Sequence, residues 1–229
     1  MTLIERTSRP IRSFVLRQGK SSKSQRTARE LYWPQYGIDL NDQMLDWQAI
    51  FKRDAKRVLE IGFGMGDSLI SLAKDNPETD FLGIEVHPPG VGRALVQANA
   101  LGLTNLKLLS LDAVVVLEQA IVDQSLDSVL LYFPDPWPKT KHHKRRIVQS
   151  SFAELVAQKL KPQGTFQLAT DWQPYAEHML SVLEACPLLV NAFGQGSFAP
   201  QQYQRPLTKF ENRGLKLGHN IWDLVYLRR

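Results

Sequence analysis

The chain has 229 residues, an apolar content of 43% and a formal net charge of +5 at pH 7. This length and composition suit one α/β domain with a short attachment, and two full domains would be cramped. No apolar run approaches the roughly 20 residues of a membrane-spanning helix, and charges interrupt the N-terminus, so we expect neither a span nor a signal peptide. The single cysteine, Cys186, excludes an internal disulfide. It fits a reducing compartment, and we expect a cytoplasmic protein.

Most of the positive charge lies at the beginning of the sequence. Residues 1–30 contain eight Lys or Arg and two Glu, a net charge of +6, whereas the remaining residues have a net charge of −1. Low periodicity predicts a flexible basic arm over residues 1–38. Such an arm either binds the phosphates of a polyanion or only solubilises the chain, and charge alone does not choose between these. Tyr32, Trp33 and Tyr36 are expected to attach the arm to a core.

Residues 39–229 are predicted to form an α/β domain in which helices and strands alternate. A helix capped by Asn41 or Asp42 and ending at Phe51 comes first. Strands are then expected at 58–61, 81–85, 106–109, 128–132 and 165–169, with helices at 68–76, 91–100, 114–122, 146–160 and 174–184. This alternation predicts a mostly parallel sheet with helices on both faces. No helix follows the final run at 221–227, which is expected to be an antiparallel strand.

The first strand leads into a turn with three alternating glycines, Gly62, Gly64 and Gly66. Residues without Cβ atoms let the chain turn tightly and let a ligand approach the unpaired N–H groups of the next helix. The turn therefore predicts a nucleotide-like cofactor. Its third glycine, however, comes one residue too early for the dinucleotide fingerprint Gly-x-Gly-x-x-Gly.

Acidic residues follow or lie within the same strands. Glu85 ends the second strand, nineteen positions after Gly66, where a doubly wound fold binds the ribose hydroxyls of its cofactor. Both NAD and S-adenosylmethionine contain this ribose. The early third glycine, Glu60 inside the first strand and Asp112 after the third favour S-adenosylmethionine.

Directly after the fourth strand comes the run Phe-Pro-Asp-Pro-Trp-Pro-Lys at positions 133–139. Its three prolines fix the backbone and leave few N–H groups to satisfy. Rigidity suits a methyl transfer, whose barrier falls when the nucleophile is aligned with the methyl group. Asp135 and Trp137 are expected to hold a planar base, one by accepting hydrogen bonds and the other by stacking. A purely structural turn with a packed Trp is the alternative.

Residues 139–146 contain five Lys or Arg and two His, and they are expected to begin a helix. A solvated helix face is the ordinary interpretation of such a run. Because this run adjoins the predicted site and shares the sign of the arm, contact with phosphates is favoured. No Cys or carboxylate stands at ligand spacing from the adjacent histidines, so no zinc site is expected.

Together these runs resemble the bacterial tRNA (guanine-N7-)-methyltransferases of the TrmB type. The resemblance extends nearly continuously from Leu59 onward, and its marks are residues 60–66, 83–87, 133–137, 144–146, 169–172 and 208–211. It implies the Rossmann-like α/β fold of class I S-adenosylmethionine-dependent methyltransferases. It also implies methyl transfer to N7 of a guanine in tRNA, expected at position 46 of the variable loop, with S-adenosylhomocysteine as the product.

The resemblance also implies a role for each matching residue. Four acidic residues and the three glycines of the turn are expected to bind the cofactor: Glu60, Gly62, Gly64, Gly66, Glu85, Asp112 and Asp135. Asp135 is expected to be catalytic as well. Substrate binding is implied for Lys139, Asp171, Thr208, Lys209, Phe210 and Glu211, and RNA binding for Lys141, His142, His143, Lys144, Arg145 and Arg146. The expected partner is tRNA, and no metal, membrane or obligatory protein partner is expected. In the arm, the family's Arg-x-Arg-Gly-Arg element is matched only weakly, by residues 17–20.

The expected chemistry agrees with the absence of an evident general base. Guanine N7 has a lone pair and no proton, so it can attack the methyl group directly, and nearby carboxylates would stabilise the cationic ring that forms. Two other classes of protein fit the sequence less well. An NAD-dependent oxidoreductase is disfavoured by the early third glycine and the basic segments. A non-catalytic RNA-binding module would be expected to have a damaged cofactor turn or to lack Asp135, and neither is seen.

Overall fold

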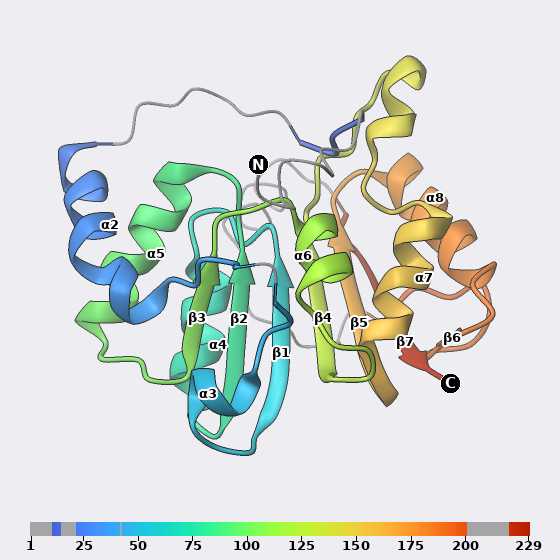
Figure 1. Cartoon of the computed structure of the whole chain (residues 1–229). Coiled ribbons are helices and arrows are strands. Elements are labelled where there is room, and N and C mark those ends of the chain that lie inside the picture. The colour runs from blue at the N-terminus through green and yellow to red at the C-terminus, as the bar shows by residue number, and fades with distance from the viewer. Residues whose placement is uncertain (1–10, 15–21, 42, 201–219) are drawn as a thin grey trace. The chain divides into compact units, whose positions relative to one another are not determined.

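The computed structural model describes residues 11–14, 22–41, 43–200 and 220–229 (Figure 1). The chain forms two compact units. Of the described residues, the first contains 22–41 and 43–122, and the second contains 11–14, 123–200 and 220–229. The arm over residues 1–38 and the single domain over residues 39–229 stay predictions. No helix within the described ranges is long and apolar enough to cross a membrane.

The first unit is built on three parallel strands in the order β3-β2-β1. They are β1 (Lys56–Ile61), β2 (Thr79–Ile84) and β3 (Leu106–Leu109), and the helices that follow them are α4 (Asp67–Asp75), α5 (Pro88–Ala100) and α6 (Ala113–Gln119). Every residue of the central strand β2 is buried, so both of its faces are covered, as is usual for parallel sheets. The predicted alternation is confirmed in this unit.

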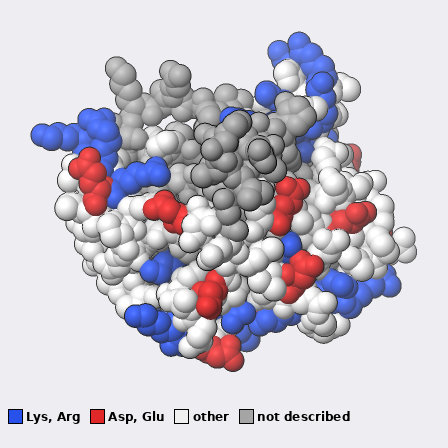
Figure 2. Space-filling model, viewed as in Figure 1, with Lys and Arg blue, Asp and Glu red and all other residues white. Residues whose placement is uncertain are grey.

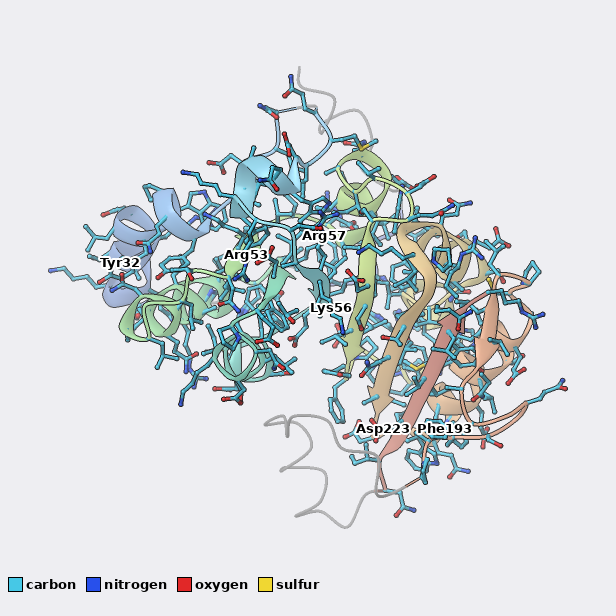
Figure 3. All side chains as sticks on the ribbon, turned by 90° about the horizontal axis from the view of Figure 1, so that it is seen from below. Tyr32, Arg53, Lys56, Arg57, Phe193 and Asp223 are labelled. Carbon is cyan, nitrogen blue, oxygen red and sulfur yellow. The ribbon has the colours of Figure 1, made fainter. Side chains whose placement is uncertain are left out.

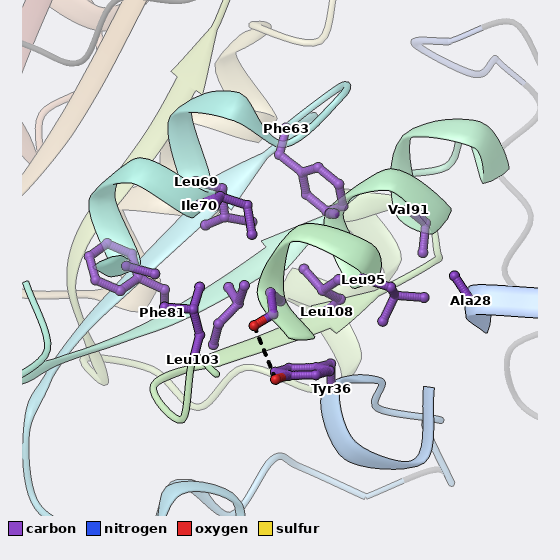
Figure 4. Packing of buried hydrophobic residues seen from close by; sticks show 14 residues of the cluster. Ala28, Tyr36, Phe63, Leu69, Ile70, Phe81, Val91, Leu95, Leu103 and Leu108 are labelled. Atoms are coloured by element: carbon purple, nitrogen blue, oxygen red, sulfur yellow. Dashed lines mark hydrogen bonds between the residues drawn. The ribbon is translucent and has the colours of Figure 1, made fainter. Parts of the chain in front are cut away.

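Part of the predicted flexible arm is a helix, α2 (Lys23–Tyr36). Ser22 caps it, and the Gln25 side chain returns a hydrogen bond to the Ser22 backbone. One face of α2 packs on α5: Ala28 and Tyr36 join the buried core, and the Tyr36 hydroxyl donates to the Ala98 carbonyl at 3.2 Å (Figure 4). The aromatic attachment to a core is confirmed, and residues 23–36 of the predicted flexible arm form a helix.

Helix α3 (Trp47–Phe51) begins later than the sequence predicted. Its cap is Asp46, whose carboxylate accepts the N–H groups of Gln48 and Ala49, and Asn41 precedes the helix. Asp42 lies outside the described residues. Arg53 follows α3 and pairs with the buried Asp80, and Figure 3 shows it beside the beginning of β1. These contacts lie at the end of the sheet away from the glycine turn.

The second unit combines parallel and antiparallel strands in the order β4-β5-β7-β6. They are β4 (Leu126–Tyr132), β5 (Leu160–Thr170), β6 (Leu189–Asn191) and β7 (Trp222–Arg228). Strand β4 is parallel to β5, and β7 is antiparallel to both β5 and β6. The predicted antiparallel final strand is confirmed, whereas the short strand β6 was not predicted.

The helix expected at residues 146–160 is interrupted in the structure. The basic run forms the 3-10 helix η1 (Thr140–Arg145), and the α-helix α7 (Ser150–Lys159) begins only after an extended segment. Gln149 stabilises this break, because its side-chain amide donates to the carbonyls of His143 and Arg146. Helix α8 (Gln173–Glu184) follows β5 as predicted.

Candidate active site

The glycine turn of the first unit has the geometry that the sequence predicts. Gly62, Gly64 and Gly66 have φ values of 71°, 57° and 83°, which L side chains rarely adopt. A Cβ added at Gly62 would meet nothing within 4 Å, so the space beside the turn is open there. Gly90 of α5 lies against the Gly64 carbonyl so closely that a Cβ would clash. Gly90 lies outside the glycine pattern of the turn, although Pro88 and Pro89 before it mark a helix start.

Glu85 is fixed against this turn by two backbone groups. Its Oε2 accepts the N–H of Gly64 at 2.7 Å, and its Oε1 accepts the N–H of His87 at 2.9 Å. Burial raises the pKa of Glu85, and the backbone donors offset part of this rise. The carboxylate is therefore held in one orientation with lone pairs still available to a ligand.

Glu60 is a buried carboxyl group with an unusual ionisation. The residue is 3% exposed, and burial raises its pKa to about 8, with the Ser68 side chain opposing the rise and the charge of Glu85 adding to it. Ser68, in the first turn of α4, is also buried. The Ser68 hydroxyl lies close enough to Glu60 to lower its pKa, but within the described structure neither Glu60 Oε2 nor Ser68 Oγ has a partner that meets the full geometry of a hydrogen bond. Unpartnered buried polar atoms are rare in proteins, and these two are suited to a polar ligand group.

Asp112 follows β3 and caps helix α6. Its Oδ1 accepts the N–H of Val114 at 3.0 Å. The glycine turn, Glu85 and Asp112 thus follow β1, β2 and β3 in turn, at the carboxyl ends of three parallel strands. They therefore lie at the edge of the first unit's sheet where open α/β sheets bind ligands.

In the second unit, the proline-rich loop directly follows β4. Phe133 and Trp137 have positive φ values of 52° and 45°, which are uncommon for residues with side chains and need support from their surroundings. The N–H of Phe133 donates to the Ala169 carbonyl, and Trp137 Nε1 donates to the Ser13 carbonyl. Asp135, between these points, is exposed.

The Trp137 ring contacts residues of the basic run. The ring of His142 stacks on it with a centroid distance of 5.8 Å, and the guanidinium of Arg145 lies 4.5 Å from the centroid of the Trp137 rings. The ring that the sequence assigned to base stacking therefore packs on the chain itself. This packing ties the proline-rich loop to η1.

The basic run presents some of its charges to solvent and buries another. Lys139, Lys141 and Lys144 are exposed, whereas Arg145 is half-buried and Arg146 is buried. His142 and His143 are half-buried. Figure 2 shows Lys and Arg side chains gathered at the upper right, over the turn η1. The exposed lysines have the placement expected of phosphate contacts, and Arg146 does not.

The remaining predicted substrate residues are only partly described. Asp171 is half-buried and follows β5, and the neighbouring Thr170 hydroxyl accepts the N–H of Trp172. Thr208, Lys209, Phe210 and Glu211 lie outside the described residues. Within the described ranges, no group of three or more His, Cys, Asp or Glu is placed to hold a metal ion.

Comparison with known proteins identifies the family. A family model described as "Putative methyltransferase" matches residues 54–224. The chain is also 54% identical to the tRNA (guanine-N(7)-)-methyltransferase of Photobacterium profundum, over 96% of this chain and 90% of that protein. The chain belongs to the tRNA (guanine-N(7)-)-methyltransferase family. The member of this family from Escherichia coli (strain K12) is 54% identical over 97% of this chain and 93% of its own length.

Solved structures confirm the fold class. The 16S rRNA methyltransferase KamB has a TM-score of 0.55 with 16% identity, over 81% of this chain and 94% of that chain. At this identity the likeness concerns the fold alone, which is that of the class I S-adenosylmethionine-dependent methyltransferases. The predicted fold and family are confirmed, and family membership excludes an NAD-dependent oxidoreductase.

The first unit fits the methyl donor of this family. S-adenosylmethionine has ribose hydroxyls and a charged amino-acid part, which need acceptors held in place and a close approach to the backbone. The open side of Gly62, the fixed carboxylate of Glu85 and the unpartnered atoms of Glu60 and Ser68 supply both.

Proposed function

We propose that this member of the family methylates N7 of the guanine at position 46, in the variable loop of tRNA. Identity of 54% over nearly the whole length of both chains supports this proposal. Because tRNA is present in the cytoplasm, we propose a cytoplasmic location.

For cofactor binding we propose roles for the residues around the glycine turn. Glu85 accepts hydrogen bonds from the ribose hydroxyls, since both its oxygens are oriented by backbone N–H groups and keep free lone pairs. Glu60 binds a cationic polar group, and Asp112 binds the nucleoside part. Gly62, Gly64 and Gly66 let the cofactor approach the backbone. When bound, S-adenosylmethionine supplies an electrophilic methyl group on sulfur.

For the reaction we propose that Asp135 is the catalytic residue. It accepts hydrogen bonds from guanine N–H groups, orients N7 and stabilises the positive charge that develops on the ring. The family resemblance also assigns Asp135 to the cofactor. No residue needs to remove a proton, because N7 has none. Further substrate contacts are proposed for Lys139, Asp171 and residues 208–211.

For RNA binding we propose that the exposed lysines of the basic run contact phosphates. Lys141 and Lys144 are the best placed, and the half-buried His142, His143 and Arg145 line the same turn. Their charges neutralise phosphates and release counterions, which makes binding depend on salt. The charge of residues 1–30 is proposed to add to this attraction.

The decisive experiment incubates the protein with labelled S-adenosylmethionine and unmodified tRNA, followed by nucleoside analysis. We expect label in 7-methylguanosine, and no label when the guanine at position 46 is replaced by adenine. Label in another base would overturn the substrate assignment. Label that persists after the replacement would overturn only the position.

A further inference from the structure

Arg146 differs from the other bases of its run. It is 3% exposed, whereas Lys139, Lys141 and Lys144 are exposed. Burying a guanidinium is costly unless the protein uses its hydrogen bonds. Its burial therefore calls for a function other than attraction of a phosphate.

The guanidinium of Arg146 contacts three groups of the second unit. Its Nε donates to the Pro136 carbonyl at 2.9 Å, and one terminal nitrogen lies 3.1 Å from His143 Nε2. Its central carbon lies 4.9 Å from the centroid of the Tyr175 ring. Burial lowers the pKa of Arg146. No carboxylate within the described part of the chain forms an ion pair with it.

The groups around Arg146 are themselves fixed. The fully buried Tyr175 hydroxyl accepts the N–H of Val148 at 3.4 Å, and His178 Nε2 lies 2.8 Å from the Val148 carbonyl. Gln149 donates to the Arg146 carbonyl. Helix α8 and the segment before α7 thus hold Arg146 against the proline-rich loop.

The hydrogen bond from Arg146 to Pro136 lies next to the proposed catalytic residue. Pro136 directly follows Asp135, in a loop whose flanking residues Phe133 and Trp137 both have positive φ. A loop rich in proline has few N–H groups of its own, so its carbonyls need donors from elsewhere. Arg146 supplies such a donor to the peptide group next to the catalytic carboxylate.

We propose that Arg146 is a positioning residue for methyl transfer, which holds the Pro136 carbonyl and thereby the orientation of Asp135, and that it is not an RNA contact. The proposal rests on the proposed function. A planar guanidinium bonds Pro136 and His143 while it stacks on Tyr175, and a lysine ammonium lacks this geometry. Charge alone is therefore insufficient at this position.

The test compares Arg146→Lys and Arg146→Gln with Lys144→Gln, a matched change at an exposed base of the same run. Two quantities are measured: the single-turnover methylation rate with S-adenosylmethionine and tRNA both saturating, and the slope of log tRNA affinity against log salt concentration. Both Arg146 variants should lower the rate by about 10- to 100-fold, as expected for misplacement near the reacting groups, and keep the wild-type slope. Lys144→Gln should flatten the slope by up to about 0.9.

The opposite pattern would overturn the proposal. If Arg146→Lys keeps both rate and slope while Arg146→Gln flattens the slope, Arg146 is a phosphate contact.

Circular dichroism and thermal melts check that the variants fold. If neither Arg146 variant folds, Gln149→Ala is tested instead, because this change removes the hydrogen bonds to the carbonyls of His143 and Arg146 without changing any charge. A lowered rate at unchanged tRNA affinity supports the proposal, and an unchanged rate contradicts it. Wild-type protein that fails to form 7-methylguanosine would instead refute the proposed function.

Discussion

Replacing Glu60 with Gln should stabilise the protein at alkaline pH while weakening its hold on S-adenosylmethionine. In the unfolded chain a glutamate ionises near its ordinary pKa of 4.5, whereas burial raises the pKa of Glu60 in the folded protein to about 8. Between these two values the folded state keeps a proton that the unfolded state has released. The free energy of unfolding therefore falls as pH rises through this window.

The size of the effect follows from the pKa difference. At about 1.4 kcal/mol per pKa unit, the free energy of unfolding of the wild type should fall by about 3–4 kcal/mol relative to that of Glu60→Gln between about pH 5 and pH 8.5. The variant cannot ionise and escapes this loss. Above about pH 8, where wild-type Glu60 is ionised, the affinity of the variant for S-adenosylmethionine should be about 10- to 100-fold lower, because a neutral amide replaces a charged acceptor of the cationic group.

The assay is urea denaturation of wild type and variant at several pH values, followed by hydrogen–deuterium exchange of peptides from β1 and β2. Such peptides report on the first unit, whose unfolding need not coincide with that of the second. Glu118→Gln, at an exposed glutamate of α6, is the control and should show no difference that grows with pH. A stability difference for Glu60→Gln that stays constant from acid to alkaline pH would refute the desolvation of Glu60.

Four further outcomes are expected. Glu85→Ala removes the acceptor of two backbone N–H groups and of the ribose, so calorimetry should show an affinity for S-adenosylmethionine about 10- to 100-fold lower; undiminished affinity would contradict its role. Asp135→Asn replaces a charged acceptor with a donor and should lower the single-turnover rate nearly as far as Asp135→Ala, with little change in tRNA affinity. A rate close to wild type would end the catalytic assignment. Lys141→Gln should flatten the salt dependence of tRNA affinity by at most about 0.9 in slope, and an unchanged slope would place this residue away from RNA. Tyr36→Phe removes the hydrogen bond that joins α2 to α5 and should lower the stability of the first unit by about 1 kcal/mol in urea, whereas no loss would mean that packing alone holds the helix.

Much of the fold could be predicted because periodicity and strand ends are local properties. The apolar run before Gly62 and the helical spacing after Gly66 already define a strand, a turn and a helix. In a parallel sheet the carboxyl ends lie at one edge, so Glu85 and Asp112 could be placed there without knowledge of packing. The antiparallel final strand followed from the lack of a helix after it.

Helix α2 could not be found in this way, because its inner face has little apolar signal. That face is formed by Gln25, Ala28 and Tyr36, and it becomes buried only because α5 offers a close approach. A Cβ at Gly92 would lie 2.8 Å from Gln25 Cβ, so only glycine admits this contact. The pair Ser22 and Gln25 forms a capping box, which was the available signal for the helix start.

The sequence pattern also did not indicate the separate role proposed for Arg146. In the basic run it looks like its neighbours, and nothing nearby in the chain distinguishes it. Its burial depends on Tyr175, which is far away in sequence, and on the carbonyl of Pro136 on its other side. Long-range contacts of this kind, and the backbone strain at Phe133 and Trp137, are tertiary properties that a local pattern does not record.

The position of β7 has a consequence for how the protein is made. This strand follows every other described strand in sequence, yet it lies between β5 and β6 and pairs with both. During synthesis β5 therefore leaves the ribosome with one long edge unpaired. Until β7 has been made, β6 has no neighbour in the described sheet. We infer that the strand order of the second unit is complete only once β7 has been made, and that until then β5 has an exposed edge of the kind that promotes aggregation.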